Sequence, residues 1–220
     1  MKKLFTLIIA LSYLYSMSVS ALHLIGGEMS YECLSNGDIR FNMYIYRDCN
    51  SGGAGFDSPA NIFLYDSNGD IAQQLQVFNP TIEQLEITTD GLCAENIPDV
   101  CVERGYYTTI VNIPNGSTSY QLVYQRCCRN PGIVNLINPD ATGSTYVLDI
   151  PPYTNNNCNN SSPVFDNYPP IVICANNPLI FDHSATDSDG DSLVYSICEP
   201  FNGANDLDPQ PSTPYPYSDV

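Results

Sequence analysis

Basic side chains are scarce in this 220-residue sequence, which has 7 lysines and arginines against 24 aspartates and glutamates. The formal net charge is −17, and it becomes more negative if an N-terminal segment containing Lys2 and Lys3 is removed. A surface of this sign repels the phosphates of nucleic acids and anionic membranes, and it attracts cations. The composition therefore argues against nucleic acid as a partner.

Motifs for metal binding and catalysis are also lacking. The sequence has 2 histidines, His23 and His183, and no pair of cysteines with CxxC spacing, so we expect no zinc site. It contains no GxSxG, HExxH or glycine-rich phosphate-binding motif. Asp182, His183 and Ser184 are the residue types of a hydrolase triad, but they are consecutive and their side chains diverge. We therefore expect no enzymatic activity; a glycosidase with an unrecognised pair of carboxylates is the alternative.

Long hydrophobic runs are absent beyond the first residues. Lys2 and Lys3 are followed by an apolar run at residues 4–14 and by small residues up to Ala21. This run is too short to span a bilayer, and the pattern is typical of a secretory signal peptide at residues 1–21. No later run reaches the length of a membrane span. We therefore expect a secreted or cell-surface protein.

Nine cysteines in an exported chain indicate disulfide bonds rather than metal ligands. They are Cys33, Cys49, Cys93, Cys101, Cys127, Cys128, Cys158, Cys174 and Cys198. Cys93 and Cys101 enclose a short loop, which favours a local bridge between them. The odd count and the abrupt proline-rich end of the sequence suggest a fragment of a longer protein; an intermolecular bridge is the alternative.

Cys127 and Cys128 are adjacent at the end of a predicted strand. Neighbouring side chains of a strand point to opposite faces, so we expect the two cysteines to bond to different partners and not to each other. The candidate partners are Cys33, Cys49 and Cys158.

Residues 28–150 show the pattern of β-structure. In residues 39–46, apolar and polar side chains alternate strictly, as in a half-buried strand. Three Asn-Gly pairs, at 36–37, 68–69 and 115–116, favour type I′ turns. We expect hairpins between 29–35 and 39–47, between 62–66 and 71–78, and between 106–113 and 119–126, with further strands at 82–88 and 145–150. This pattern predicts an all-β fold, with an antiparallel β-sandwich at residues 22–150.

The remaining residues predict a linker and a second, incomplete domain. Residues 151–170 are rich in proline and asparagine, which is typical of a linker. Strand-like runs at 171–174, 179–181 and 193–197 indicate the start of a second β-domain at residues 171–220, too short for a sandwich of about 100 residues. The proline-rich stretch 209–216 is expected to be extended.

An acidic turn precedes the last of these runs. Asp187, Asp189 and Asp191 surround Gly190, which permits a tight bend. Three carboxylates that close repel one another, and a calcium ion would relieve that repulsion, with Asp182 or a backbone carbonyl completing its oxygen shell. The spacing is not that of an EF-hand. The candidates are therefore a calcium site and a solvated turn without metal.

Tyrosines on the polar side of a strand form a second candidate site. Tyr44 and Tyr46 alternate with the apolar residues of 39–46, and flat aromatic rings bind sugars and peptide surfaces well. Further tyrosines are candidates to lie beside them: Tyr31, Tyr106, Tyr107, Tyr120 and Tyr124. The simpler interpretation is that tyrosine is selected by its preference for β-sheets.

Four segments carry a resemblance to a known family. They read LHLIGGEMSYEC at 22–33, YRDCNSGGAGFDSPANIFLYDSNGD at 46–70, YQRCCRNPGIVNLINP at 124–139 and FDHSATDSDGDSLVYSIC at 181–198. The chain resembles the N-terminal region of large secreted surface proteins of gliding and related Bacteroidetes, described as gliding motility-associated or adhesin-like and exported by type IX secretion. This resemblance implies immunoglobulin-like or cadherin-like β-domains followed by a C-terminal sorting domain. The sequence has no sorting domain, which agrees with the expectation of a fragment.

The residues and the resemblance lead to one principal functional expectation. We expect a non-catalytic structural or adhesion module, stabilised by disulfides and stiffened by calcium if the acidic turn binds it. Its expected partners are other β-domains of the same polypeptide, surface proteins or glycans. The alternatives are a carbohydrate-binding module that uses the outward tyrosines, and an extracellular hydrolase.

Overall fold

The computed structural model describes residues 24–220, apart from 51, 88–98, 115 and 154–156. The predicted signal peptide at 1–21 lies outside the described residues. The strands are β1 (Leu24–Cys33), β2 (Ile39–Asp48), β3 (Ala60–Asp66), β4 (Ile71–Val77), β5 (Thr81–Gln84), β6 (Val102–Val111), β7 (Tyr120–Arg126), β8 (Ser144–Ile150), β9 (Val164–Phe165) and β10 (Ala185–Thr186), and η1 (Pro139–Ala141) is a short 3-10 helix. Among the described residues, no helix has the length and apolar character needed to cross a membrane.

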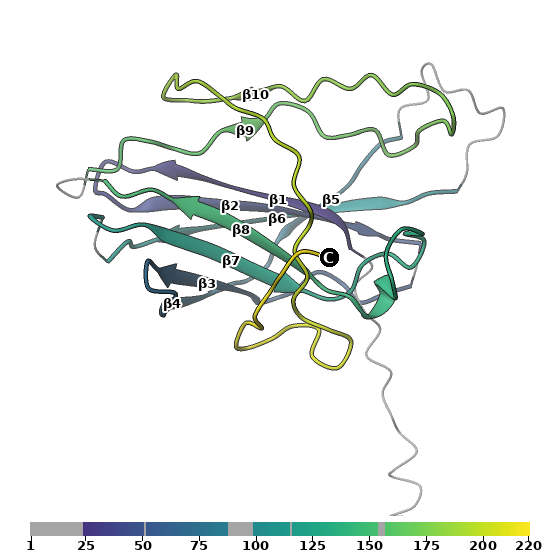
Figure 1. Cartoon of the computed structure of the whole chain (residues 1–220), viewed down its shortest axis with the longest axis horizontal. Helices are drawn as coiled ribbons and strands as arrows, with labels where there is room; N and C mark the ends of the chain where they lie inside the picture. Colours follow the sequence, from purple (N-terminus) through teal and green to yellow (C-terminus); the bar gives the residue numbers. More distant parts are fainter. Residues whose placement is uncertain (1–23, 51, 88–98, 115, 154–156) are drawn as a thin grey trace, which may run out of the picture.

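Eight of the strands form two antiparallel sheets that pack face to face (Figure 1). One sheet has the order β1-β2-β6-β5 and the other β4-β3-β7-β8. A two-stranded ribbon of β9 and β10 lies beyond the β1-β2-β6-β5 sheet (Figure 1). The predicted all-β sandwich is therefore confirmed.

Alternation along the strands builds the core between the sheets. The apolar side chains of residues 39–46 are fully buried, and their polar neighbours face outward, as predicted. Gly37 and Gly69 have φ of 87° and 81°, which glycine adopts without strain, and both turns connect hairpin strands as expected. The third Asn-Gly pair begins at Asn115, which lies outside the described residues.

The predicted hairpin between 106–113 and 119–126 is wrong. Strand β6 pairs with β2 and β5, whereas β7 pairs with β3 and β8. Both edges of β6 are therefore occupied within its own sheet, and the chain crosses to the opposite sheet after Val111. Local turn chemistry did not reveal this crossing, because an Asn-Gly pair indicates a bend and not the partner of the following strand.

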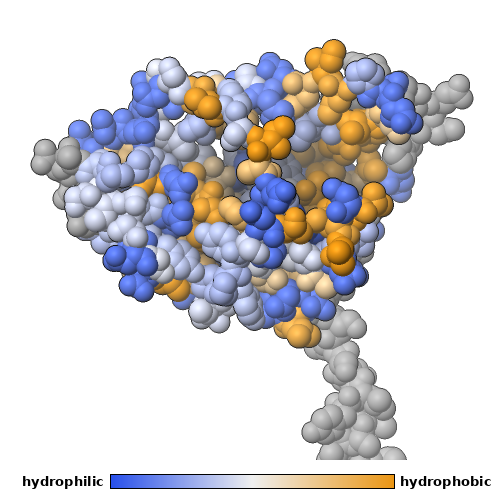
Figure 2. All heavy atoms as spheres, in the orientation of Figure 1, coloured by the Kyte–Doolittle hydropathy of each residue, from blue (hydrophilic) through white to orange (hydrophobic). Residues whose placement is uncertain are grey.

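The three strand-like runs predicted after residue 170 are not strands. The structure assigns β10 to Ala185–Thr186 and no strand to 171–174, 179–181 or 193–197. Their apolar side chains have no neighbouring strand to pack against, and Ile180 and Ile197 are 96% and 103% exposed. On the face drawn in Figure 2, hydrophobic residues accordingly lie in separate patches among hydrophilic ones. The domain boundaries at 150 and 170 stay predictions.

The proline-rich stretch at 209–216 has no regular secondary structure and packs on the sandwich. Phe63 and Val123 are opposite each other on the face of their sheet that points away from the core, yet they are 1% and 0% exposed. Beside them, the side-chain amide of Gln125 donates to the carbonyl of Tyr215 at 2.8 Å and accepts from its N–H at 2.9 Å. The C-terminal segment therefore covers this outer face.

The disulfide pattern differs from the expected one. Cys33 bonds to Cys158, and Cys49 bonds to Cys101. The predicted bridge between Cys93 and Cys101 is therefore wrong; Cys93 itself lies outside the described residues. The reason is long-range register: Asp48 is opposite Val102 in the pairing of β2 with β6, so the next residue, Cys49, meets Cys101.

Cys127 and Cys128 bond to each other, which also corrects the prediction. Strand β7 ends at Arg126, so the alternation of side chains does not extend to the two cysteines. Cys174 is disulfide-bonded as well, whereas the thiol of Cys198 is free and exposed.

Candidate functional site

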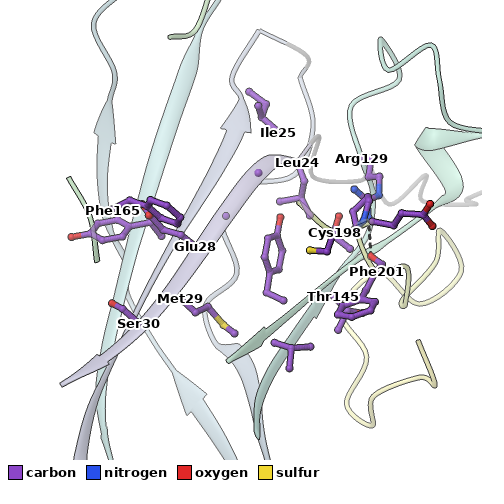
Figure 3. Close-up of a pocket in the computed structure, with 18 of the residues that line it drawn as sticks. Leu24, Ile25, Glu28, Met29, Ser30, Arg129, Thr145, Phe165, Cys198 and Phe201 are labelled. Carbon is purple, nitrogen blue, oxygen red and sulfur yellow. Dashed lines mark hydrogen bonds between the residues drawn. The ribbon is translucent and has the colours of Figure 1, made fainter. Parts of the chain in front are cut away.

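A cleft of about 580 Å³ lies between β1 and β8, the two strands that end their sheets on the same side of the sandwich (Figure 3). These strands run side by side in the same direction (Figure 1). The walls of the cleft are largely apolar. The apolar residues that line it include Leu24, Met29, Tyr146, Val147, Phe165 and Phe201. The cleft therefore lies at the side of the sandwich where the edge strands β1 and β8 face each other without hydrogen bonding to each other.

Two later segments attach to these edge strands and bound the cleft. At one end, Ser162 N–H donates to Tyr31 C=O at 2.9 Å, and Tyr31 N–H donates to the Ser162 hydroxyl oxygen at 2.8 Å. At the other end, Thr145 N–H donates to Phe201 C=O at 3.2 Å. Between these attachments the chain forms the β9-β10 ribbon beyond the β1-β2-β6-β5 sheet, and its two ends, at 163–165 and 198–201, line the cleft.

Arg129 and Glu28, two of the charged side chains that line the cleft, are engaged in hydrogen bonds. Arg129 donates to Gly143 C=O at 3.1 Å and to Phe201 C=O at 2.8 Å, which the dashed lines of Figure 3 show in part. Burial lowers the pKa of Arg129. Glu28 accepts from the Tyr46 hydroxyl at 2.7 Å, and burial, with this bond, raises the pKa of Tyr46. The cleft thus offers a largely apolar wall, with charged side chains of both signs, Arg129, Glu28 and Glu199, in its lining.

Gly27 of β1 lies in the lining of the cleft, and neighbouring side chains pack closely against its backbone. A Cβ on Gly27 would approach side-chain carbons of Ile45 and Tyr146 to 2.8 Å each, a distance that real Cβ atoms do not show. The aromatic ring of Tyr146 therefore lies directly against the backbone of β1, and glycine is required for the two sheets to approach here.

A buried ion pair lies on the core side of the β4-β3-β7-β8 sheet, at the end of β7. Arg126 and Asp57 are 2% and 3% exposed, and Arg126 Nε donates to Asp57 Oδ1 at 2.8 Å. The Tyr124 hydroxyl donates to Asp57 Oδ2 at 2.9 Å, and the side-chain amide of Gln210 donates to Asp57 Oδ1. Arg126 Nη1 also donates to the carbonyl of Pro209 at 2.9 Å. The pair therefore holds the C-terminal segment at residues 209–210.

Burial dominates the electrostatics of this pair. It raises the pKa of Asp57 more than Arg126 and the hydrogen bonds lower it, and it raises the pKa of Tyr124 well above its ordinary value. Tyr124 is therefore a neutral donor. Nothing in the spacing of Asp57 and Arg126 along the sequence links the two residues. One signal for the pair exists: alternation from Tyr120 places Arg126 on the buried face, where a charged side chain needs a partner.

The acidic turn forms, but its carboxylates bond to backbone amides. Asp187 Oδ1 accepts from the N–H groups of Asp189 and Asp191 at 2.9 and 3.1 Å, and Gly190 has φ of 83°. Asp189 Oδ2 accepts from the N–H of Ser161 at 2.6 Å. No group of three His, Cys, Asp or Glu side chains in the described part of the chain is placed to hold a metal ion. Calcium binding stays a prediction.

Only part of the predicted tyrosine surface is outward-facing. Tyr44 and Tyr106 are neighbours across β2 and β6, and their rings stack at 4.8 Å between centroids. The Arg104 guanidinium lies 4.9 Å above the Tyr44 ring. Tyr46 lies on the same side of β2 as Tyr44 and is half-buried, with its hydroxyl bonded to Glu28. The remaining candidates are buried: Tyr31, Tyr107, Tyr120 and Tyr124. They point inward because each lies on the core side of its strand.

Comparison of the chain with protein-family models, curated proteins and solved structures found no match. The resemblance to Bacteroidetes surface proteins therefore stays a prediction from sequence. The geometry itself provides three features: an apolar cleft between sheet edges, an outward pair of stacked tyrosines, and an ion pair that holds the C-terminal segment.

Proposed function

We propose that the protein is a non-catalytic structural or adhesion module at the cell surface or in the extracellular space. The observation that carries this proposal is the attachment of the chain after β8 to the sandwich. Cys158 is bonded to Cys33 in β1, and residues 209–210 are held by the pair of Asp57 and Arg126. A sandwich held in this way resists being pulled open, which is the property that a load-bearing surface module needs.

The disulfide between Cys33 and Cys158 contributes a large part of the stability of this attachment. The bridge between Cys33 and Cys158 spans 125 residues of sequence. In the chain-entropy model, a loop of this size stabilises the folded state by about 4–5 kcal/mol. The three disulfides of the described residues are compatible with an extracellular location, since such bonds persist in oxidising compartments. The partners proposed from the resemblance are other β-domains, surface proteins or glycans.

Force spectroscopy on the full chain tests the mechanical role. We expect a high unfolding force under oxidising conditions and a clear fall in the variant with Cys33→Ser and Cys158→Ser. The matched control is Cys198→Ser, which removes a free thiol and leaves the unfolding force unchanged. An unfolding force that is low and equal in all three proteins would count against the proposal, and so would turnover of a substrate that is lost on changing a single carboxylate.

The stacked tyrosines favour carbohydrate binding as a second candidate. Tyr44 and Tyr106 form a flat aromatic pair, with the Asn42 amide oxygen accepting from the Tyr106 hydroxyl at 2.7 Å and Arg104 beside the rings. Aromatic faces bordered by polar groups bind sugar rings. A glycan array tests this candidate: binding that is lost in Tyr44→Ala and kept in Tyr65→Ala, on the other sheet, supports it, and an array without a hit rejects it.

A further inference from the structure

Among the described residues, one residue of β8 is paired on the outer edge of the strand. Thr145 N–H donates to Phe201 C=O, so the backbone of Thr145 points away from β7. In an antiparallel ladder every second residue points the same way, which places the N–H and C=O groups of Val147 and Asp149 on this outer edge. Within the described ranges, neither residue has a backbone partner there. The edge is therefore open beyond Thr145.

Empty space borders this edge along its whole length. The cleft described above is lined by residues 144–147, and a neighbouring hollow of about 430 Å³ is lined by Leu148, Asp149 and Pro151. One segment of the chain contributes to both: Cys198 and Glu199 line the cleft, and Ser192 lines the neighbouring hollow. Figure 3 shows Cys198 beside Phe201 and Thr145 at the paired end.

We infer that this edge is a strand-docking site and that its occupant is the chain's own segment Ile197–Phe201. The bridge between Thr145 and Phe201 is antiparallel and fixes the register. Continuing it places Glu199 opposite Val147, and Ile197 opposite Asp149. The intervening residues, Cys198 and Pro200, turn their backbone nitrogens away from β8, so the missing N–H of Pro200 removes no ladder hydrogen bond.

The present side-chain arrangement agrees with this register. Residues opposite each other in a ladder share a face of the sheet. Phe201 already lies on the outer face, with its ring 5.2 Å from that of Tyr217, so Glu199 and Ile197 join that face. Cys198 then points to the inner side, where it already lines the cleft. Ile197, now 103% exposed, gains a place beside Val147.

The length of the segment also fits. The five residues of β8 from Thr145 to Asp149 span about 13 Å, since four steps of about 3.3 Å separate the first from the last, and the five residues from Phe201 to Ile197 span the same distance when extended. The other end of the segment is held by the bond between Asp189 and Ser161. Residues 190–196 remain as a loop, so docking breaks neither attachment, and the hydrogen bond between Tyr195 and Ala185 can persist.

Docking would give the sheet a fifth strand and cover the open edge. An unpaired edge is a template for pairing with another chain, and natural β-proteins cover such edges. This inference goes beyond the proposed function, because it depends on the backbone of β8 and not on the role of the module.

Amide hydrogen exchange on the full, disulfide-bonded chain tests the inference. We expect the amides of Val147 and Asp149 to be protected as Thr145 is. Ile197→Pro removes the N–H that would donate to Asp149 C=O and sets the proline ring against the β8 edge, so this end of the docked strand should separate and exchange at the Asp149 amide should accelerate by at least about tenfold. Glu199→Pro should do the same at Val147. Because Ile197 is exposed in the structure, neither change is expected to prevent folding.

The matched control is Ile180→Pro, the same substitution at a residue that is 96% exposed and lies outside the proposed strand. It should leave both amides protected. Unprotected amides at Val147 and Asp149 in the unaltered chain overturn the inference. Protection that survives both Ile197→Pro and Glu199→Pro also overturns it, because another strand must then occupy the edge, and a dimer on sizing would show that a second copy supplies it.

Discussion

Replacing Asp57 by asparagine provides a sharp test of how the C-terminal segment is held. The substitution keeps the size of the side chain and removes its charge, so Arg126 is left as an unpaired cation that is 2% exposed. Removing one partner of a buried ion pair costs about 3–5 kcal/mol, because the remaining charge has lost its compensation. In a chain of this length each kcal/mol corresponds to roughly 2–4 °C, so the Tm should fall by roughly 6–20 °C.

The assay is thermal unfolding of the disulfide-bonded protein, followed by circular dichroism. The matched control is Glu32→Gln, which breaks the ion pair between Arg40 and Glu32 on the surface, where the side chains are 46% and 55% exposed. Exposed pairs contribute less than about 1 kcal/mol, so the control should shift the Tm by only a few degrees, about 4 °C at most.

Limited proteolysis adds a readout that is specific to the network. Because Asp57 and Arg126 bind Gln210 and Pro209, Asp57→Asn should also make the segment after Phe201 more sensitive to protease. The reasoning is refuted if Asp57→Asn and Glu32→Gln have equal effects on the Tm, or if a large loss of stability leaves the segment as protected as before.

Burial raises the pKa of Tyr31 and Tyr146 to about 12 from an ordinary 10.0, so their contribution to stability is complete below pH 10 and is lost as pH rises toward 12; tyrosinate absorbance should appear together with unfolding. Replacing Cys33 and Cys158 by serine should lower the free energy of unfolding in urea by about 2–5 kcal/mol. Iodoacetamide should alkylate Cys198 in the native protein, and mass spectrometry should find that adduct missing in Cys198→Ser.

The sandwich could be predicted from sequence because its signals are local. Alternation at 39–46 identifies a half-buried strand, and the Asn-Gly pairs at 36–37 and 68–69 mark its first turns. What could not be predicted depends on contacts between distant residues. Cys49 meets Cys101 because β2 and β6 are neighbours, and β6 does not pair with β7 although the sequence has an Asn-Gly pair between them.

The candidate site shows the same division. The acidic turn around Gly190 was found as a turn, since its geometry is set by adjacent residues. The ion pair of Asp57 and Arg126 was missed, because its members are far apart in sequence and Asp57 lies in no strand. Strand-like residues at 193–197 were expected to pair, but pairing needs a neighbour that composition does not specify.

The residues after β8 cover what the sandwich leaves open. Ser161 and Ser162 satisfy the β1 edge at Cys33 and Tyr31, and the stretch at 209–216 covers Phe63 and Val123 on the outer face. The β8 edge beyond Thr145 has no backbone partner among the described residues. The later residues thus cover one outer face and part of the β1 edge, and they carry a segment in register with the β8 edge. An open edge is a template for pairing with another chain, so this arrangement protects the side of the sandwich where β1 and β8 lie.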